Sequence, residues 1–96
     1  MPKYVSLVNW TDQGIRNAKD SVGRAEAAQA AAKAMGGTFE IYYTVGAYDI
    51  VTVSEFPDDE TATAFLIQLG SLGNVRSSTM RAFDLSEMRG ILAKLG

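Results

Sequence analysis

The sequence predicts an α+β protein, a ferredoxin-like sandwich whose elements follow the order β-α-β-β-α-β. Three observations carry this prediction: a β-hairpin over residues 39–54, a helical pattern on each side of it, and a further strand beyond each helical pattern. The hairpin consists of two runs rich in aromatic and β-branched residues, separated by a short turn that contains Gly46. We expect residues 1–96 to form one domain.

The first strand is expected at residues 3–10, which are rich in Val, Leu, Tyr and Trp. A helix follows between residues 11 and 35, because apolar side chains recur there every three or four positions. Thr11-Asp12 supplies its N-cap, and Gly36-Gly37 ends it, since glycine accepts the left-handed conformation at a helix C-terminus. Glycines near its start weaken the helix, so irregular first turns are expected.

After the hairpin, Asp58-Asp59 is expected to cap a second helix that closes at Gly70 and Gly73. The fourth strand, residues 75–83, is more polar than the others, which suits a sheet edge. Its arginines are expected in solvent or in ion pairs. Ser86-Glu87 then opens an amphipathic helical tail, which should dock on its own subunit or on a neighbour.

Both helices are expected on one face of the sheet, which leaves the other face uncovered. The residues expected to face the helices are Val5, Leu7, Phe39, Ile41, Val51 and Val53. The residues expected on the open face are Tyr4, Ser6, Val8, Trp10, Tyr42, Thr44, Tyr48, Ile50, Thr52 and Ser54. Such an aromatic face is typical of an interface or a ligand groove. Two sheets packed face to face would form a dimeric α/β barrel, so a homodimer or higher homo-oligomer is expected.

Composition excludes several classes of function. Nine Lys and Arg against eleven Asp and Glu give a net charge of −2, and the charges are interspersed, which argues against a nucleic-acid partner. There is no cysteine and no histidine, which excludes disulfides, thiolate nucleophiles, Ser-His-acid catalysis and Cys or His metal sites. Neither a metal nor a cofactor is expected. Without a secretory signal or a membrane-spanning apolar run, a cytoplasmic protein with no membrane partner is expected.

The candidate chemical residues lie in or near the hairpin. Asp49 could act as a general base, with Tyr42 or Tyr48 donating a hydrogen bond to an enolate. Alternatively, Asp49 caps the turn through backbone hydrogen bonds. Trp10, Tyr42 and Tyr43 could line a pocket for an aromatic ligand, or they could pack an interface between subunits. The sequence leaves both pairs of interpretations open.

Three segments of the chain carry a family resemblance. The first segment combines Tyr4–Leu7 and Trp10–Ile15, the second is Lys19–Ser21, and the third is Tyr43–Val51. Together they resemble the GYD-domain family, named for a glycine, tyrosine and aspartate signature that corresponds here to Gly46, Tyr48 and Asp49, with Ala47 interposed. The resemblance implies a ferredoxin-like subunit of the dimeric α/β-barrel type, similar in that respect to cofactor-free monooxygenases and small ligand-binding barrels. It implies no activity, because the family has no established one.

The expected function is that of a small-molecule binding module of the dimeric α/β-barrel type, which takes a small aromatic or anionic metabolite. The candidate ligand-binding residues are Trp10, Gln13, Tyr42, Thr44, Tyr48 and Asp49. One alternative is a cofactor-independent monooxygenase or isomerase with Asp49 as its catalytic base. The other alternative is a structural or regulatory assembly protein without a pocket.

Overall fold

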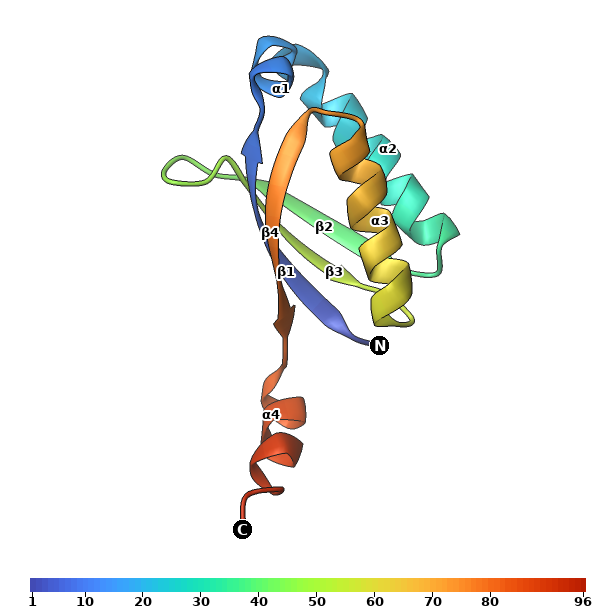
Figure 1. The fold of residues 1–96 in the computed structure, drawn as a ribbon, viewed down its shortest axis with the longest axis vertical. Coiled ribbons are helices and arrows are strands. Elements are labelled where there is room, and N and C mark those ends of the chain that lie inside the picture. Colours follow the sequence, from blue (N-terminus) through green and yellow to red (C-terminus); the bar gives the residue numbers. More distant parts are fainter.

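A computed structural model describes residues 1–96 and has two layers, a four-stranded sheet with two long helices on one face (Figure 1). The strands are β1 (Lys3–Trp10), β2 (Thr38–Tyr43), β3 (Ile50–Glu55) and β4 (Val75–Ala82). Their order in the sheet is β2-β3-β1-β4, and every neighbouring pair is antiparallel. The ferredoxin-like prediction is confirmed, and β4 lies at a sheet edge as expected.

The helix expected over residues 11–35 is divided into three pieces. They are α1 (Asp12–Arg16), a 3-10 turn η1 (Ala18–Asp20) and α2 (Ser21–Ala34). Thr11 caps α1, because its Oγ1 accepts a hydrogen bond from the amide of Gly14 at 3.1 Å. The helix ends where Gly36 takes a φ of +82°, a conformation that favours glycine. The expected irregular start and glycine stop are therefore both confirmed.

The second long helix, α3 (Asp59–Ser71), has Asp58 as its N-cap, whose Oδ1 accepts from the amide of Thr61 at 2.7 Å. Gly73, with φ +82°, follows its end, whereas Gly70 lies inside the helix and does not close it. The tail forms α4 (Leu85–Leu92). Asp84 caps α4 and forms a capping box with Glu87, so the helix begins before the expected position.

The predicted faces of β1 and β3 are wrong, and those of β2 are right. Side chains beneath the helices are Tyr4, Ser6, Val8, Ile50, Thr52 and Ser54, all buried. Val5, Leu7, Val51 and Val53 lie half-buried on the open face instead. In this helix-facing layer, the Ser6 hydroxyl is paired with the Thr79 hydroxyl at 2.8 Å, whereas the Thr52 hydroxyl has no partner. The open face is consequently mainly aliphatic, with Tyr42 beside Val51 as its aromatic residue.

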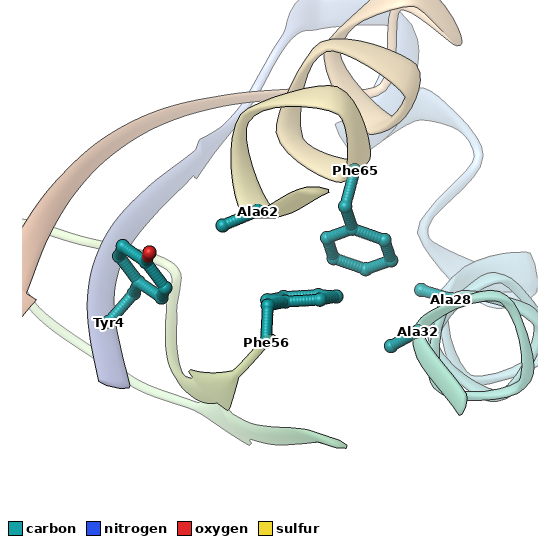
Figure 2. Close-up of a cluster of buried hydrophobic side chains, with 6 residues drawn as sticks. All are labelled: Tyr4, Ala28, Ala32, Phe56, Ala62 and Phe65. Carbon is teal, nitrogen blue, oxygen red and sulfur yellow. The ribbon is translucent and has the colours of Figure 1, made fainter. Parts of the chain in front are cut away.

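The hydrophobic core occupies one end of the space between sheet and helices. It consists of Tyr4, Ala28, Ala32, Phe56, Ala62 and Phe65 (Figure 2). The rings of Phe56 and Phe39 each lie 5.0 Å from that of Phe65, measured between centroids. Phe65 lies in the middle of α3, and Phe39 and Phe56 lie at the ends of the hairpin strands away from the loop. The other end of the interlayer space, near Trp10, has no comparable filling.

The tail helix α4 projects from the end of β4 away from the sandwich (Figure 1). None of its residues is buried, and Leu85 is 86% exposed. At its base, Lys3 forms an ion pair with Asp84 at 3.3 Å. The expectation that the tail docks on its own subunit is wrong, which leaves docking on a neighbour as the open alternative.

Candidate functional site

A cavity of about 100 Å³ lies between the sheet and the two long helices; it extends from the aromatic core, which it meets at Ala28 and Phe39, toward Trp10. It forms because α2 presents small side chains there, including Ser21, Ala25 and Ala28, while α3 contributes Leu66, Leu69 and Gly70. Twelve of its 19 lining residues are hydrophobic, so the space is mainly apolar. Leu72 and Tyr43, which also line it, are well exposed, so the cavity opens to solvent beside them.

Two buried polar atoms that belong to residues lining the cavity have no hydrogen-bond partner within the protein. These are the indole Nε1 of Trp10 and the hydroxyl Oγ1 of Thr52, and both are buried. Thr52 is only 3% exposed, so its hydroxyl has little access to bulk water. A buried polar group without a partner costs about 1–3 kcal/mol, and most such groups in proteins are paired. These two atoms are therefore polar groups beside the cavity that the protein itself leaves unsatisfied.

Aromatic side chains form one wall of this cavity. The rings of Trp10 and Tyr43 lie 6.3 Å apart between centroids at an interplanar angle of 37°. The Tyr43 hydroxyl hydrogen-bonds to the Ser21 hydroxyl at 2.9 Å, which ties β2 to the start of α2. Of the three aromatic residues that the sequence offered for a pocket, Trp10 and Tyr43 line this cavity and Tyr42 does not.

Arg24 is the only charged residue in the cavity wall. Its Nη1 donates to the carbonyl of Asn17 at 2.9 Å, and its Nη2 donates to the carbonyl of Gly14 at 3.4 Å. No carboxylate lies within ion-pair distance of this guanidinium. The formal charge of the wall is therefore a single positive charge without a counterion.

Asp49 lies next to Trp10, but it does not line the cavity. Its Oδ2 accepts from the backbone amide of Trp10 at 2.9 Å, and its own amide donates to the carbonyl of Val8 at 3.0 Å. The carbonyl of Asp49 accepts from the amide of Thr44, and the Thr44 hydroxyl donates to the backbone carbonyl of Tyr48. Asp49 and Thr44 thus fasten the hairpin loop to the end of β1.

Gln13 lies just outside the cavity and holds the loop between α3 and β4. Its Nε2 donates to the carbonyl of Leu72 at 3.1 Å and to Oδ1 of Asn74 at 2.9 Å. Gly14 packs against the same loop so closely that a Cβ there would lie 1.9 Å from the carbonyl oxygen of Asn74. Leu72 and Asn74 line the cavity, so Gln13 supports the wall without contributing to it.

The remaining two candidates, Tyr42 and Tyr48, lie outside the cavity. Tyr42 is on the open face of the sheet, 55% exposed, and its hydroxyl donates to Glu40, which raises the pKa of Tyr42. Tyr48 is exposed in the hairpin loop. The structure thus brings Trp10 and Asp49 together and leaves both tyrosines apart from the space that Trp10 lines.

The family model described as GYD domain matches residues 4–92. The chain belongs to the GYD-domain family. No curated protein and no solved structure matched it in the same comparisons. In this GYD-domain protein, the signature loop has Gly46 at a φ of +154° and Asp49 bonded to Trp10. Two of the three segments that carried the resemblance, Trp10–Ile15 and Tyr43–Val51, therefore meet at the end of β1, where Trp10, Tyr43 and Ile50 line the cavity.

A second polar cluster lies in the GYD-domain protein at the core end of the sandwich. The Tyr4 hydroxyl donates to Asp59 at the start of α3, and Arg81 of β4 pairs with Asp59 at 4.0 Å. Burial, followed by the hydrogen bond to Asp59, raises the pKa of Tyr4 to about 12. Arg81 also lies 4.6 Å above the ring of Phe83, so this arginine is ion-paired as expected.

Sequence reasoning did not single out Ser21, Arg24 and Thr52 as site residues. Arg24 lies on a helix and comes near Trp10 only through the packing of α2 on the sheet, so no local pattern marks it. No group of three or more Asp, Glu, Cys or His side chains is arranged to hold a metal ion. None of the helices has the length and apolar composition required to cross a bilayer.

Proposed function

We propose that this GYD-domain protein is a small-molecule binding module whose ligand occupies the cavity between the sheet and helices α2 and α3. The observation that carries the proposal is a mainly apolar cavity whose lining residues include two with buried, unpartnered polar atoms, Trp10 Nε1 and Thr52 Oγ1. Apolar pockets with a few placed polar groups are the usual form of a ligand site. A ligand that offers oxygen or nitrogen atoms to these groups would remove their desolvation cost.

The size of the cavity limits the ligand to a small molecule. Its volume of about 100 Å³ is well below the roughly 300–1,000 Å³ of drug-sized sites. It is closer to the roughly 150 Å³ of an engineered apolar cavity that admits benzene. We therefore propose a ligand with one ring or a short chain.

The proposal contains no catalytic step. The alternative with Asp49 as a base needs its carboxylate to reach the ligand, whereas that carboxylate accepts the Trp10 amide and lies outside the cavity wall. Binding alone requires only the cavity, its polar atoms and its opening beside Tyr43 and Leu72.

The protein is also proposed to act as a homodimer or higher homo-oligomer. Aliphatic side chains on the open sheet face and apolar residues on the projecting α4 both lack a covering surface within the subunit. A second copy that packs its open face against the first would bury Val5, Leu7, Val51 and Val53 and form the α/β barrel. The tail α4 of each copy could then lie on its neighbour.

A cavity-filling variant tests the binding proposal. Ala25 lines the cavity, whereas Ala27, two positions along α2, is exposed, so Ala25→Leu and Ala27→Leu form a matched pair. Benzyl alcohol serves as the probe, and the emission of Trp10, the only tryptophan, reports binding. We expect a saturable response in the wild type and in Ala27→Leu and its loss in Ala25→Leu. The same response in all three proteins, or none in any, would refute the proposal.

A further inference from the structure

We propose that the ligand of this cavity is a small monoanion with an apolar body, of which an aromatic carboxylate is the simplest example. Its charged group would meet Arg24, and its ring would occupy the apolar part of the cavity. This inference rests on the proposed binding function and adds the chemical class of the ligand. It assigns Arg24, which the family signature does not include, as the residue that determines specificity.

The charge of the wall is the first argument. Among its 19 residues, Arg24 carries the only formal charge, and none is Asp or Glu. An arginine side chain has five N–H donors, and the structure gives two of them to the carbonyls of Asn17 and Gly14. Arg24 as a residue is half-buried and lines the cavity, so its remaining donors are available to a ligand there. Arginine binds carboxylates there through short, charge-assisted hydrogen bonds.

The neutral polar groups of the wall point to the same class of ligand. The indole N–H of Trp10 can only donate, and it has no acceptor. Asn74 uses its Oδ1 to accept from Gln13, which leaves its side-chain N–H₂ group as a donor. Together with Arg24, these residues offer N–H groups from β1, α2 and the start of β4. An anion supplies acceptors for such a wall, whereas an ammonium ligand would meet a like charge and unusable donors.

The rest of the wall fits an uncharged, flat body. Val8, Ile41, Ile50, Leu66 and Leu69 supply an aliphatic surface between the sheet and α3. The Trp10 and Tyr43 rings add a flat aromatic boundary. The small volume excludes a large substituent and agrees with a single ring. The polar and apolar surfaces together therefore describe an amphipathic anion.

The rival interpretation gives Arg24 a purely structural role. Its two hydrogen bonds go to carbonyls of residues 14 and 17, at the end of α1, where a cation is favourable. Under this interpretation, removal of the charge would lower stability, but it would not change the preference between a charged and a neutral probe of equal shape. The two roles can therefore be separated by a selectivity ratio.

The experiment compares benzoate with benzamide, which has a similar shape and no charge, by titration of Trp10 emission. The proteins are the wild type, Arg24→Gln and the control Arg89→Gln, which changes an exposed arginine on α4. We expect the wild type and Arg89→Gln to bind benzoate at least about tenfold more tightly than benzamide. In Arg24→Gln the ratio should fall to about one, while benzamide still binds.

Each other outcome has a definite meaning. If the wild type binds both probes equally and Ala25→Leu binds neither, the inference on the anion is overturned and the binding proposal stands. If the wild type binds neither probe and does not bind benzyl alcohol, the binding proposal itself is overturned. If Arg24→Gln retains the wild-type ratio, Arg24 is not the specificity residue. Should Arg24→Gln fail to fold, Arg24→Lys provides the second variant, in which the ratio should fall without vanishing, because lysine keeps the charge and loses the planar fork.

Discussion

At the scale of single residues, Asp49 is the signature position whose role the structure defines most closely. Its carboxylate accepts the backbone amide of Trp10 at 2.9 Å. Asp49→Ala should lower the free energy of unfolding by about 1.5–3 kcal/mol, the range for hydrogen bonds to charged groups, and Asp49→Asn by about 1 kcal/mol. Urea unfolding measures both values, with Glu26→Gln on the exposed side of α2 as the control.

A contrary result for Asp49 would revive the catalytic alternative. If Asp49→Asn keeps full stability but abolishes turnover of a substrate, Asp49 would be a catalytic base and the proposal of binding without catalysis would be wrong.

Tyr4 gives the protein a pH dependence at high pH. Its pKa is raised to about 12 in the folded protein, against an ordinary value of 10.0. Because the folded state holds this proton more tightly, the stability contribution is complete below pH 10 and is lost as the pH rises toward 12. The difference between a pKa of 10.0 and one of about 12 corresponds to about 2–3 kcal/mol of folding free energy. Thermal unfolding between these pH values should show a smaller loss of stability in Tyr4→Phe than in the wild type. An equal loss in both would show that other groups control alkaline unfolding.

At the scale of elements, the junction between β1 and α1 needs a glycine. A Cβ at Gly14 would lie 1.9 Å from the Asn74 carbonyl oxygen, and that carbonyl also accepts from Thr11 at 3.1 Å. Gly14→Ala should therefore destabilise the protein by about 1–3 kcal/mol, the usual cost of overpacking. Gly23→Ala is the control, since nothing lies within 4 Å of its added carbon within α2. That change should stabilise by about 0.5–1 kcal/mol. If Gly14→Ala and Gly23→Ala changed the stability equally, the close approach of Gly14 to the Asn74 carbonyl would be contradicted.

Much of the element structure could be predicted because it depends on local chemistry. Thr11 and Asp58 cap their helices through their own side chains, and Gly36 takes the positive φ expected at a helix end. The sheet faces of β1 and β3 could not be predicted in the same way, because both alternating sets contain apolar residues. Ser6 lies beneath the helices only because Thr79, far along the chain, supplies its partner.

The candidate site was predictable only in part, for the same physical reason. Trp10 stood out as a large aromatic at a strand end, and it does line the cavity. Arg24 and Thr52 became site residues through tertiary packing, which places α2 against the sheet at β2, next to β3. The volume of the cavity depends on the distance between α2, with its small side chains, and the sheet. No local sequence pattern predicts that distance.

At the scale of the whole molecule, the small core indicates why a partner is expected. Only 14 of 96 residues are buried, and α4 contributes none of them. This is a low share even for a chain of this size, so surface remains for an interface. The sheet face and the tail are two separate candidates for that interface.

Glutamate substitutions separate these two surfaces. Leu7→Glu places a charge on the open sheet face, and Leu92→Glu places one on α4, whereas Val45→Glu changes a fully exposed loop residue. Sedimentation equilibrium of the wild type should give a dimer or a multiple of it. Leu7→Glu should dissociate the barrel pair, since an unpaired buried charge is strongly unfavourable, and Val45→Glu should not. A monomeric wild type would contradict the proposed assembly.

The measurement that tests the central claim most directly is the mapping of amide chemical shifts during titration with benzoate. The cavity account expects the shifts to concentrate in β1 near Trp10, in α2 between Ser21 and Ala28, and in α3 between Leu66 and Leu72. The same titration of Ala25→Leu should give no such shifts. Shifts confined to the open sheet face or to α4, or no shifts at all, would contradict a ligand site between the sheet and the helices.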